Sequence, residues 1–205
     1  RTEINSTDKI SPLLVSAYPT TLPLLIGELS SDNVMDNGGQ FDTDELIEKL
    51  YLWDSPSISS YDSPYALWEG CYAAIASANM ALEGIENLGS PASLNPQRGE
   101  ALVCRAYSHF LLANVFCMPY NPNTAESHLG IPYRTRTGDS VYPENTERGS
   151  LKNTYEQIAA DLEAGLPLIK DAAYEVPKYH FNRKAANAFA ARFYLYYQKW
   201  DKVIE

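Results

Sequence analysis

The fold is decided by an apolar stretch at residues 99–116, GEALVCRAYSHFLLANVF. On a helical wheel its large apolar side chains cover nearly every direction, and a helix that is apolar all round is buried on most of its faces. The stretch therefore predicts a central helix wrapped by other helices. Arg105 and His109 lie on one face of it. A buried guanidinium needs a carboxylate or carbonyl partner, and Glu100 and acidic residues of neighbouring helices are the candidates.

A long helix is predicted immediately before the central one. Apolar residues recur at helical spacing over Pro64–Leu88. Ser63 is suited to cap this helix, with Pro64 at its first position. Asn79 falls on the apolar face, where we expect its amide to hydrogen-bond a neighbouring backbone group. A turn around Gly89 then connects the two helices as a hairpin.

Further helices are predicted on both sides of this hairpin. Downstream, Ser150 caps a helix that Pro167 kinks or ends, and Asn182 caps an alanine-rich helix over Arg183–Gln198. Asp201 is expected to cap one more helix. Upstream, shorter helices are expected from Ser11 to Tyr18, over the apolar run Leu22–Leu29, and over Thr43–Leu52. The pattern predicts an all-α fold of tetratricopeptide-like helical hairpins, an α-solenoid, with long irregular loops at 36–64 and 118–149.

The amino-acid composition argues against some classes of function. The 205-residue chain has a formal net charge of −10, which argues against binding a nucleic-acid backbone. Its 15 Tyr and 3 Trp are suited to a binding surface as well as to a core. The three cysteines, Cys71, Cys104 and Cys117, form no metal or redox motif, and we expect no metal and no cofactor. Cys71 and Cys104 lie in apolar helical segments, where we expect buried thiols. No apolar run is long enough to span a membrane. Because the chain starts at Arg1 and stops soon after a helix begins, we expect it to be part of a longer protein.

Several motifs, taken in order, resemble the SusD/RagB family of nutrient-binding outer-membrane lipoproteins of Bacteroidetes. They are Ser31-Asp32-Asn33-Val34, Trp68-x3-Tyr72-x2-Ile75-x2-Ala78-Asn79, Gly99-Glu100-Ala101-x3-Arg105-Ala106-x3-Phe110-x-Leu112, Gly130-Ile131-Pro132, Arg148-Gly149-Ser150-x4-Tyr155-x2-Ile158-x2-Asp161-Leu162, and Arg183-x-Ala185-Ala186 with the trailing Trp200. The chain departs from the family at Cys117, where a glycine is usual. The C-terminal part of the family fold is also absent.

The resemblance implies a lipid-anchored protein exposed on the cell outer membrane, which captures an oligosaccharide or another nutrient. It also implies a SusC-like TonB-dependent outer-membrane transporter as the partner that receives this nutrient. Residues 1–205 would be the N-terminal part of a SusD-like helical domain. The lipid anchor would lie upstream of Arg1, and the protein would touch the membrane only through it.

The resemblance further implies that ligand contacts of this half lie in the loop 36–64. Sugar recognition needs flat aromatic faces together with carboxylates or amides. Trp53 beside Asp54 is therefore the first predicted pair, with Tyr51, Tyr61 and Asp62 behind it. The alternative for Trp53 is an indole folded back onto the core. Tyr61 is expected to be exposed because polar residues flank it.

Other conspicuous residues are predicted to be structural. Trp68, Tyr72 and Trp200 lie at core spacing, and Arg105 and Asp161 are interpreted as structural ions that could pair. Catalysis has little support, because His109, His128 and His180 are isolated and the acids Asp42, Asp44 and Glu45 suit a helix start. The prediction is a binding protein and not an enzyme. The alternative is a helical-repeat scaffold that binds peptide or protein in a groove.

Overall fold

The computed structural model describes residues 4, 6–38, 44–57, 59–138 and 147–204. Over these residues the chain is helical and contains no strand, which confirms the all-α prediction. The α-helices are α1 (Ile10–Leu14), α2 (Leu24–Leu29), α3 (Glu45–Tyr51), α4 (Pro64–Asn87), α5 (Asn95–Phe116), α6 (Leu151–Gly165), α7 (Arg183–Tyr196) and α8 (Trp200–Ile204). Short 3-10 turns accompany them at Thr7–Lys9, Val15–Ala17, Ala92–Leu94, Leu166–Leu168, Asp171–Ala173 and Pro177–Tyr179.

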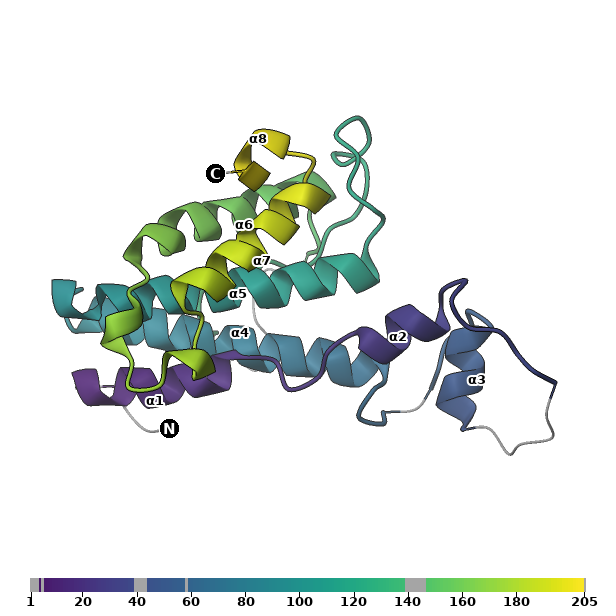
Figure 1. Cartoon of the computed structure of the whole chain (residues 1–205), viewed down its shortest axis with the longest axis horizontal. Helices are drawn as coiled ribbons and strands as arrows, with labels where there is room; N and C mark the ends of the chain where they lie inside the picture. The colour runs from purple at the N-terminus through teal and green to yellow at the C-terminus, as the bar shows by residue number, and fades with distance from the viewer. Residues whose placement is uncertain (1–3, 5, 39–43, 58, 139–146, 205) are drawn as a thin grey trace.

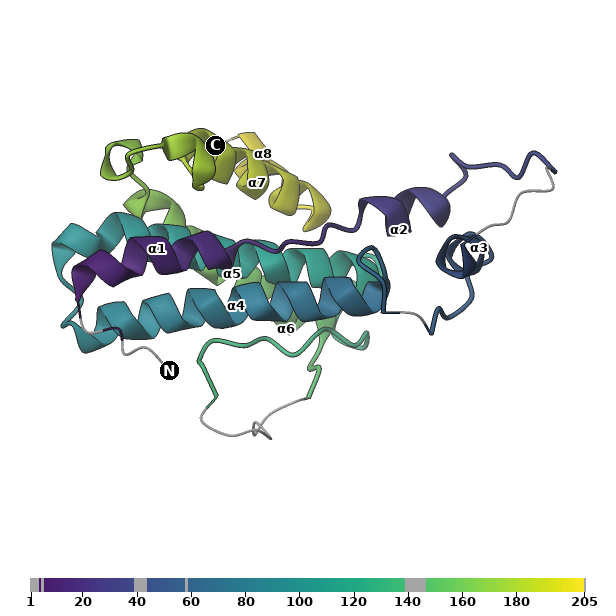
Figure 2. The ribbon, with the colours of Figure 1, turned by 90° about the horizontal axis from the view of Figure 1, so that it is seen from below.

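Helix α5 is the centre of the bundle, as its sequence predicts. Of its 22 residues, 16 are buried. Helix α4 lies along it as the other arm of a hairpin, α6 packs against it from another side, and α1 lies beside α4 and α5 (Figures 1 and 2). Ser63 caps α4 by accepting a hydrogen bond from the Ala66 amide at 3.1 Å, with Pro64 next in the helix.

Helices α5 and α6 approach so closely that their backbones touch. A Cβ atom added to Gly99 would lie 2.7 Å from the carbonyl oxygen of Gly165, and one added to Gly165 would lie 2.9 Å from the oxygen of Gly99. No side chain fits in that space without moving a backbone. The two glycines therefore set the distance between the central helix and its neighbour.

Arg105 and Asp161 form the buried ion pair that links α5 to α6. The guanidinium donates to both carboxylate oxygens, with Nε–Oδ2 at 2.7 Å and Nη2–Oδ1 at 2.6 Å, a bidentate geometry. Its Nη1 also donates to the Asn79 amide oxygen at 2.9 Å, and the Tyr133 hydroxyl donates to Asp161 at 2.6 Å. The predicted pairing is confirmed, and the partner is an acid of a neighbouring helix rather than Glu100.

The segment 132–135 crosses α4 and α5 and is held mainly by its backbone. Four bonds join it to side chains of the two helices: Tyr72 Oη to Pro132 O at 2.8 Å, Asn79 Nδ2 to Arg134 O at 3.1 Å, Arg105 Nη1 to Thr135 O at 3.2 Å, and Arg134 N to His109 Nε2 at 3.1 Å. The predicted structural roles of Asn79 and Tyr72 are confirmed.

Three predictions about element ends are wrong. Helix α1 begins at Ile10 and not at Ser11, because a 3-10 turn at Thr7–Lys9 leads straight into it. Gln198 adopts a positive φ of 60°, so α7 stops at Tyr196 and the chain turns before α8. Asp201 then lies inside the first turn of α8 and does not cap it.

Trp200 is 59% exposed on α8, so its prediction as a core residue is also wrong.

A second apolar cluster supports the end of the molecule that carries α2 and α3. It joins buried residues of these two helices to α4, to the end of α5 and to Ile131 in the loop after α5; its members are Ile26, Leu46, Leu50, Leu67, Cys71, Ile75, Leu111, Leu112 and Ile131. The Ser30 hydroxyl donates to Leu50 O at 3.1 Å and so joins the end of α2 to α3. Helices α2 and α3 extend beyond the bundle at this end (Figure 1).

Candidate functional site

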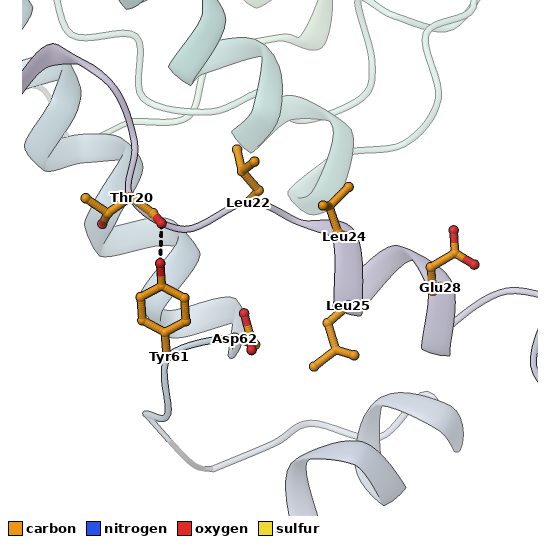
Figure 3. Close-up of a pocket in the computed structure, with 7 residues that line it drawn as sticks. All are labelled: Thr20, Leu22, Leu24, Leu25, Glu28, Tyr61 and Asp62. Carbon is orange, nitrogen blue, oxygen red and sulfur yellow. Dashed lines mark hydrogen bonds between the residues drawn. The ribbon is translucent and has the colours of Figure 1, made fainter. Parts of the chain in front are cut away.

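A pocket of about 480 Å³ lies where the chain enters α2 and α4. One wall comes from α2 and the segment that leads into it, and the other from the two residues before the α4 cap. The lining residues are Thr20, Leu22, Leu24, Leu25, Glu28, Tyr61 and Asp62 (Figure 3). The predicted residues Tyr61 and Asp62 thus meet in one concave site.

Tyr61 is fixed across this pocket. Ser63 and Pro64 start helix α4, which places Tyr61 just before the helix. Its hydroxyl donates to the carbonyl oxygen of Thr20, 41 residues away in sequence (Figure 3). The side chain is nevertheless 66% exposed, as predicted from its polar neighbours. The bond restrains the ring and leaves its surface open to a ligand.

The pocket combines apolar surface with carboxylates. Leu22 and Leu24 are exposed leucines, Glu28 is an exposed acid, and Asp62 is half-buried. Carboxylate oxygens accept hydrogen bonds from hydroxyl groups, and the leucines and the Tyr61 ring offer apolar contact. No basic residue is among the seven that line the pocket. The arrangement suits a ligand that has both hydroxyl groups and an apolar face, and that carries no negative charge.

Trp53 occupies an unusual backbone position at the end of α3. Its φ is 57°, the left-handed region that glycine favours after a helix. The Trp53 amide donates to Leu50 O at 3.3 Å, and the Asp54 amide donates to Lys49 O at 2.8 Å. These two bonds form a Schellman motif. The indole is 79% exposed, so the alternative in which it folds onto the core does not hold.

The five predicted residues fall in two places. Tyr61 and Asp62 line the pocket, whereas Tyr51, Trp53 and Asp54 lie at the C-terminal end of α3 and are not among its lining residues. The Tyr51 hydroxyl accepts a hydrogen bond from the Asp36 amide at 3.3 Å, and Asp54 is exposed. Because α2 packs against α3, both places belong to the same end of the molecule.

The lining residues between 20 and 28 were not predicted from the sequence as part of a binding site. The sequence gives little indication of a binding surface there, because Leu22 and Leu24 flank Pro23 in an apolar run that is typical of a buried short helix. Both leucines are instead exposed. Nothing local indicates that Thr20 accepts the hydrogen bond of Tyr61, because that contact is tertiary.

Burial shifts the pKa values of two core side chains, His109 and Cys71. His109 is fully buried, and burial lowers its pKa from 6.5 to about 3, so the ring is neutral at pH 7. Its Nε2 accepts from the Arg134 amide, which leaves Nδ1 to donate to Arg105 O at 2.9 Å. Burial raises the pKa of the Cys71 thiol to about 12. Within the described residues no group of His, Cys, Asp or Glu could hold a metal ion, and no helix is long and apolar enough to cross a membrane.

Comparison with solved structures shows which proteins share this fold. A SusD superfamily protein from Bacteroides fragilis matches with a TM-score of 0.77 and 22% identity, over 99% of this chain and 49% of that one. The surface glycan-binding protein A from Bacteroides fluxus matches with a TM-score of 0.68 and 23% identity, over 95% and 41%. A laminarin-binding SusD-like protein matches with a TM-score of 0.63 and 17% identity, over 97% and 42%. The chain thus spans less than half the length of these structures.

At these identities the structural matches show that this chain shares the fold of the SusD-like proteins. No curated protein matches the sequence. A SusD-like family model, described as "Starch-binding associating with outer membrane", matches residues 1–195. That match covers most of the chain and includes the motifs of α4, α5 and α6. The chain therefore belongs to the SusD-like family.

Proposed function

We propose that the protein is the glycan-binding component of an outer-membrane uptake system. It captures an oligosaccharide at the cell surface and passes it to a SusC-like TonB-dependent transporter. It is held at the outer membrane by a lipid anchor, and it binds its ligand without transforming it. Family membership over residues 1–195 supports this proposal, as does the surface glycan-binding protein that shares the fold.

The observation that carries the proposal is the pairing of Tyr61 and Asp62 in one pocket. A restrained aromatic ring with 66% exposure stands beside a carboxylate, with apolar leucines on the facing wall. A pyranose ring has an apolar C–H face and hydroxyl groups around its edge, which match these two kinds of surface. We propose that Trp53 and Asp54, with Tyr51, extend the same ligand-binding end along the tip of α3.

The test is a glycan array probed with the full-length protein and with three variants. Tyr61→Ala and Trp53→Ala each remove one aromatic face, and we expect each to weaken glycan binding about 5- to 150-fold, since the stacking of a nucleic-acid base on an aromatic side chain contributes about 1–3 kcal/mol. Tyr65→Ala is the matched control, because Tyr65 is an exposed tyrosine of α4 that lies outside the pocket lining. Its binding should equal that of the unmodified protein.

The array also separates this proposal from its alternative. Glycan binding that survives both Tyr61→Ala and Trp53→Ala would move the site away from this end of the chain. No binding to any glycan, together with binding to a peptide library, would instead support a helical-repeat scaffold for peptides or proteins.

A further inference from the structure

A second and larger pocket, of about 660 Å³, lies between α1 and the segment 173–180. This segment packs beside α1, toward the end of the bundle away from α3 (Figure 1). None of its lining residues belongs to the pocket of Tyr61 and Asp62. It is therefore a separate site, which the proposed function does not use.

The inner side of this pocket carries a histidine with a fixed orientation. His180 Nδ1 lies 2.7 Å from Oε1 of Glu100, a residue of α5 whose exposure is 0%. The same oxygen accepts the Tyr18 hydroxyl at 2.6 Å. The His180 ring also stacks on Tyr174 with the centroids 4.1 Å apart. A ring held at one edge and on one face has little freedom to turn.

This orientation leaves one ring nitrogen for a ligand. Because a carboxylate oxygen accepts, Nδ1 of His180 is the donor in this contact, and in the Nδ1–H tautomer Nε2 is the acceptor. Among the described residues, no hydrogen bond of Nε2 to the protein is found. His180 lines the pocket and its side chain is 14% exposed. Nε2 is therefore free to accept a hydrogen bond from a hydroxyl group of a bound molecule.

The outer walls supply a flat apolar surface and two more polar groups. Tyr179 is 77% exposed, and Val15 and Val176 are exposed beside it. Ser11 contributes a hydroxyl and Glu175 a carboxylate to the lining. The aromatic face, the hydroxyl-binding groups and the absence of Lys and Arg from the lining together match a neutral saccharide better than a purely apolar or an anionic ligand.

We propose that this pocket is a second saccharide-binding site, in which Tyr179 stacks on a sugar ring and His180 Nε2 accepts a hydrogen bond from a sugar hydroxyl. Glu100 is a positioning residue that acts through His180. The ligand class rests on the proposed function, whereas the location of the site does not.

The test is an NMR titration of the full-length protein, labelled with 15N at histidine, with laminarihexaose and maltohexaose, two neutral glucose oligomers. We expect a saturable shift of the His180 Nε2 resonance with at least one of them. Tyr179→Ala removes an exposed ring and should weaken this response at least tenfold. Tyr61→Ala and the control Tyr65→Ala should leave it unchanged. Glu100→Gln should change the 15N signature of the His180 tautomer together with the affinity of this site.

The outcomes separate the two sites. A binding isotherm that depends on Tyr61 with no response of His180 would overturn the second site and leave the proposed function intact. A His180 response that Tyr61→Ala abolishes would also overturn it, because the two pockets would then not be independent. A His180 response without any effect of Tyr61→Ala on total binding would support the second site and count against the first. Binding of neither sugar at either site would overturn both.

Discussion

His109 illustrates how burial fixes the charge of one side chain. Its pKa is lowered to about 3 in the folded protein, against 6.5 for a free imidazole. As the pH falls below 6.5, the His109 imidazole becomes protonated in the unfolded chain and stays neutral in the folded chain. The contribution of His109 to stability is therefore complete above pH 6.5 and is lost as the pH falls toward 3, at about 1.4 kcal/mol per pH unit.

This residue gives a prediction for pH dependence. Between pH 7 and pH 5, His109 should account for a loss of about 2 kcal/mol in the free energy of unfolding. Urea denaturation of His109→Gln at the two pH values should show a smaller difference than the unmodified protein, by about that amount. Equal differences in the two proteins would show that His109 is not held neutral by burial.

Trp53 gives a second prediction at the scale of one residue. A non-glycine residue in the left-handed region costs about 1–2 kcal/mol, and an exposed indole recovers little of this by packing. Trp53→Gly should therefore raise the free energy of unfolding by about 1 kcal/mol and at the same time weaken glycan binding. Trp53→Ala keeps the backbone strain and should weaken binding without stabilising the fold. Thermal melting and isothermal titration measure the two effects, and a destabilised Trp53→Gly protein would contradict the assignment of strain.

At the scale of the elements, the backbone contact between Gly99 and Gly165 decides how α5 and α6 pack. Gly99→Ala should push α6 away and lower the free energy of unfolding by about 1–3 kcal/mol, as overpacking usually does. Gly27→Ala is the matched control, because nothing lies within 4 Å of a Cβ at that helical position. It should leave stability unchanged or raise it by up to about 1 kcal/mol. Denaturant titration distinguishes them, and similar effects of the two substitutions would contradict the close contact.

The elements also show what a sequence can reveal. Helix α4 was predictable within one residue, because the Ser63–Pro64 start and the spacing of its apolar residues are both local signals. The end of α7 was not predictable, because the left-handed residue after the helix is Gln198, whereas the usual sequence signal for such a turn is a glycine. The exposure of Trp200 was missed because helical spacing shows which residues share a face, but not whether another element covers that face.

At the scale of the whole molecule, the net charge of −10 and the acids of the Tyr61 pocket favour neutral ligands. We predict that the full-length protein binds a neutral glucan more tightly than a polyuronate, and that added salt narrows the difference because it screens repulsion. Affinity electrophoresis at low and high ionic strength measures this preference. The double variant Glu28→Gln/Asp62→Asn should reduce it, and tighter binding of the polyuronate by the unmodified protein would contradict the prediction.

The candidate site was only partly predictable at this scale. Tyr61 and Asp62 could be proposed from their residue types and polar surroundings. The wall that they face could not, because the contact between Tyr61 and Thr20 joins residues 41 positions apart. The same holds for the pocket of His180, since Glu100 and His180 are 80 residues apart and no local signal pairs them.

The anchoring of the segment 132–135 has an evolutionary consequence. Side chains of α4 and α5 hold three of its carbonyl oxygens and one of its amides. Every residue type presents the carbonyl, and every type except proline presents the amide. Selection on this contact therefore acts on Tyr72, Asn79, Arg105 and His109, and leaves the side chain of Thr135 free to drift. Homologues should vary at that position while they retain the four helical residues, so the surface there can diverge between species without loss of the fold.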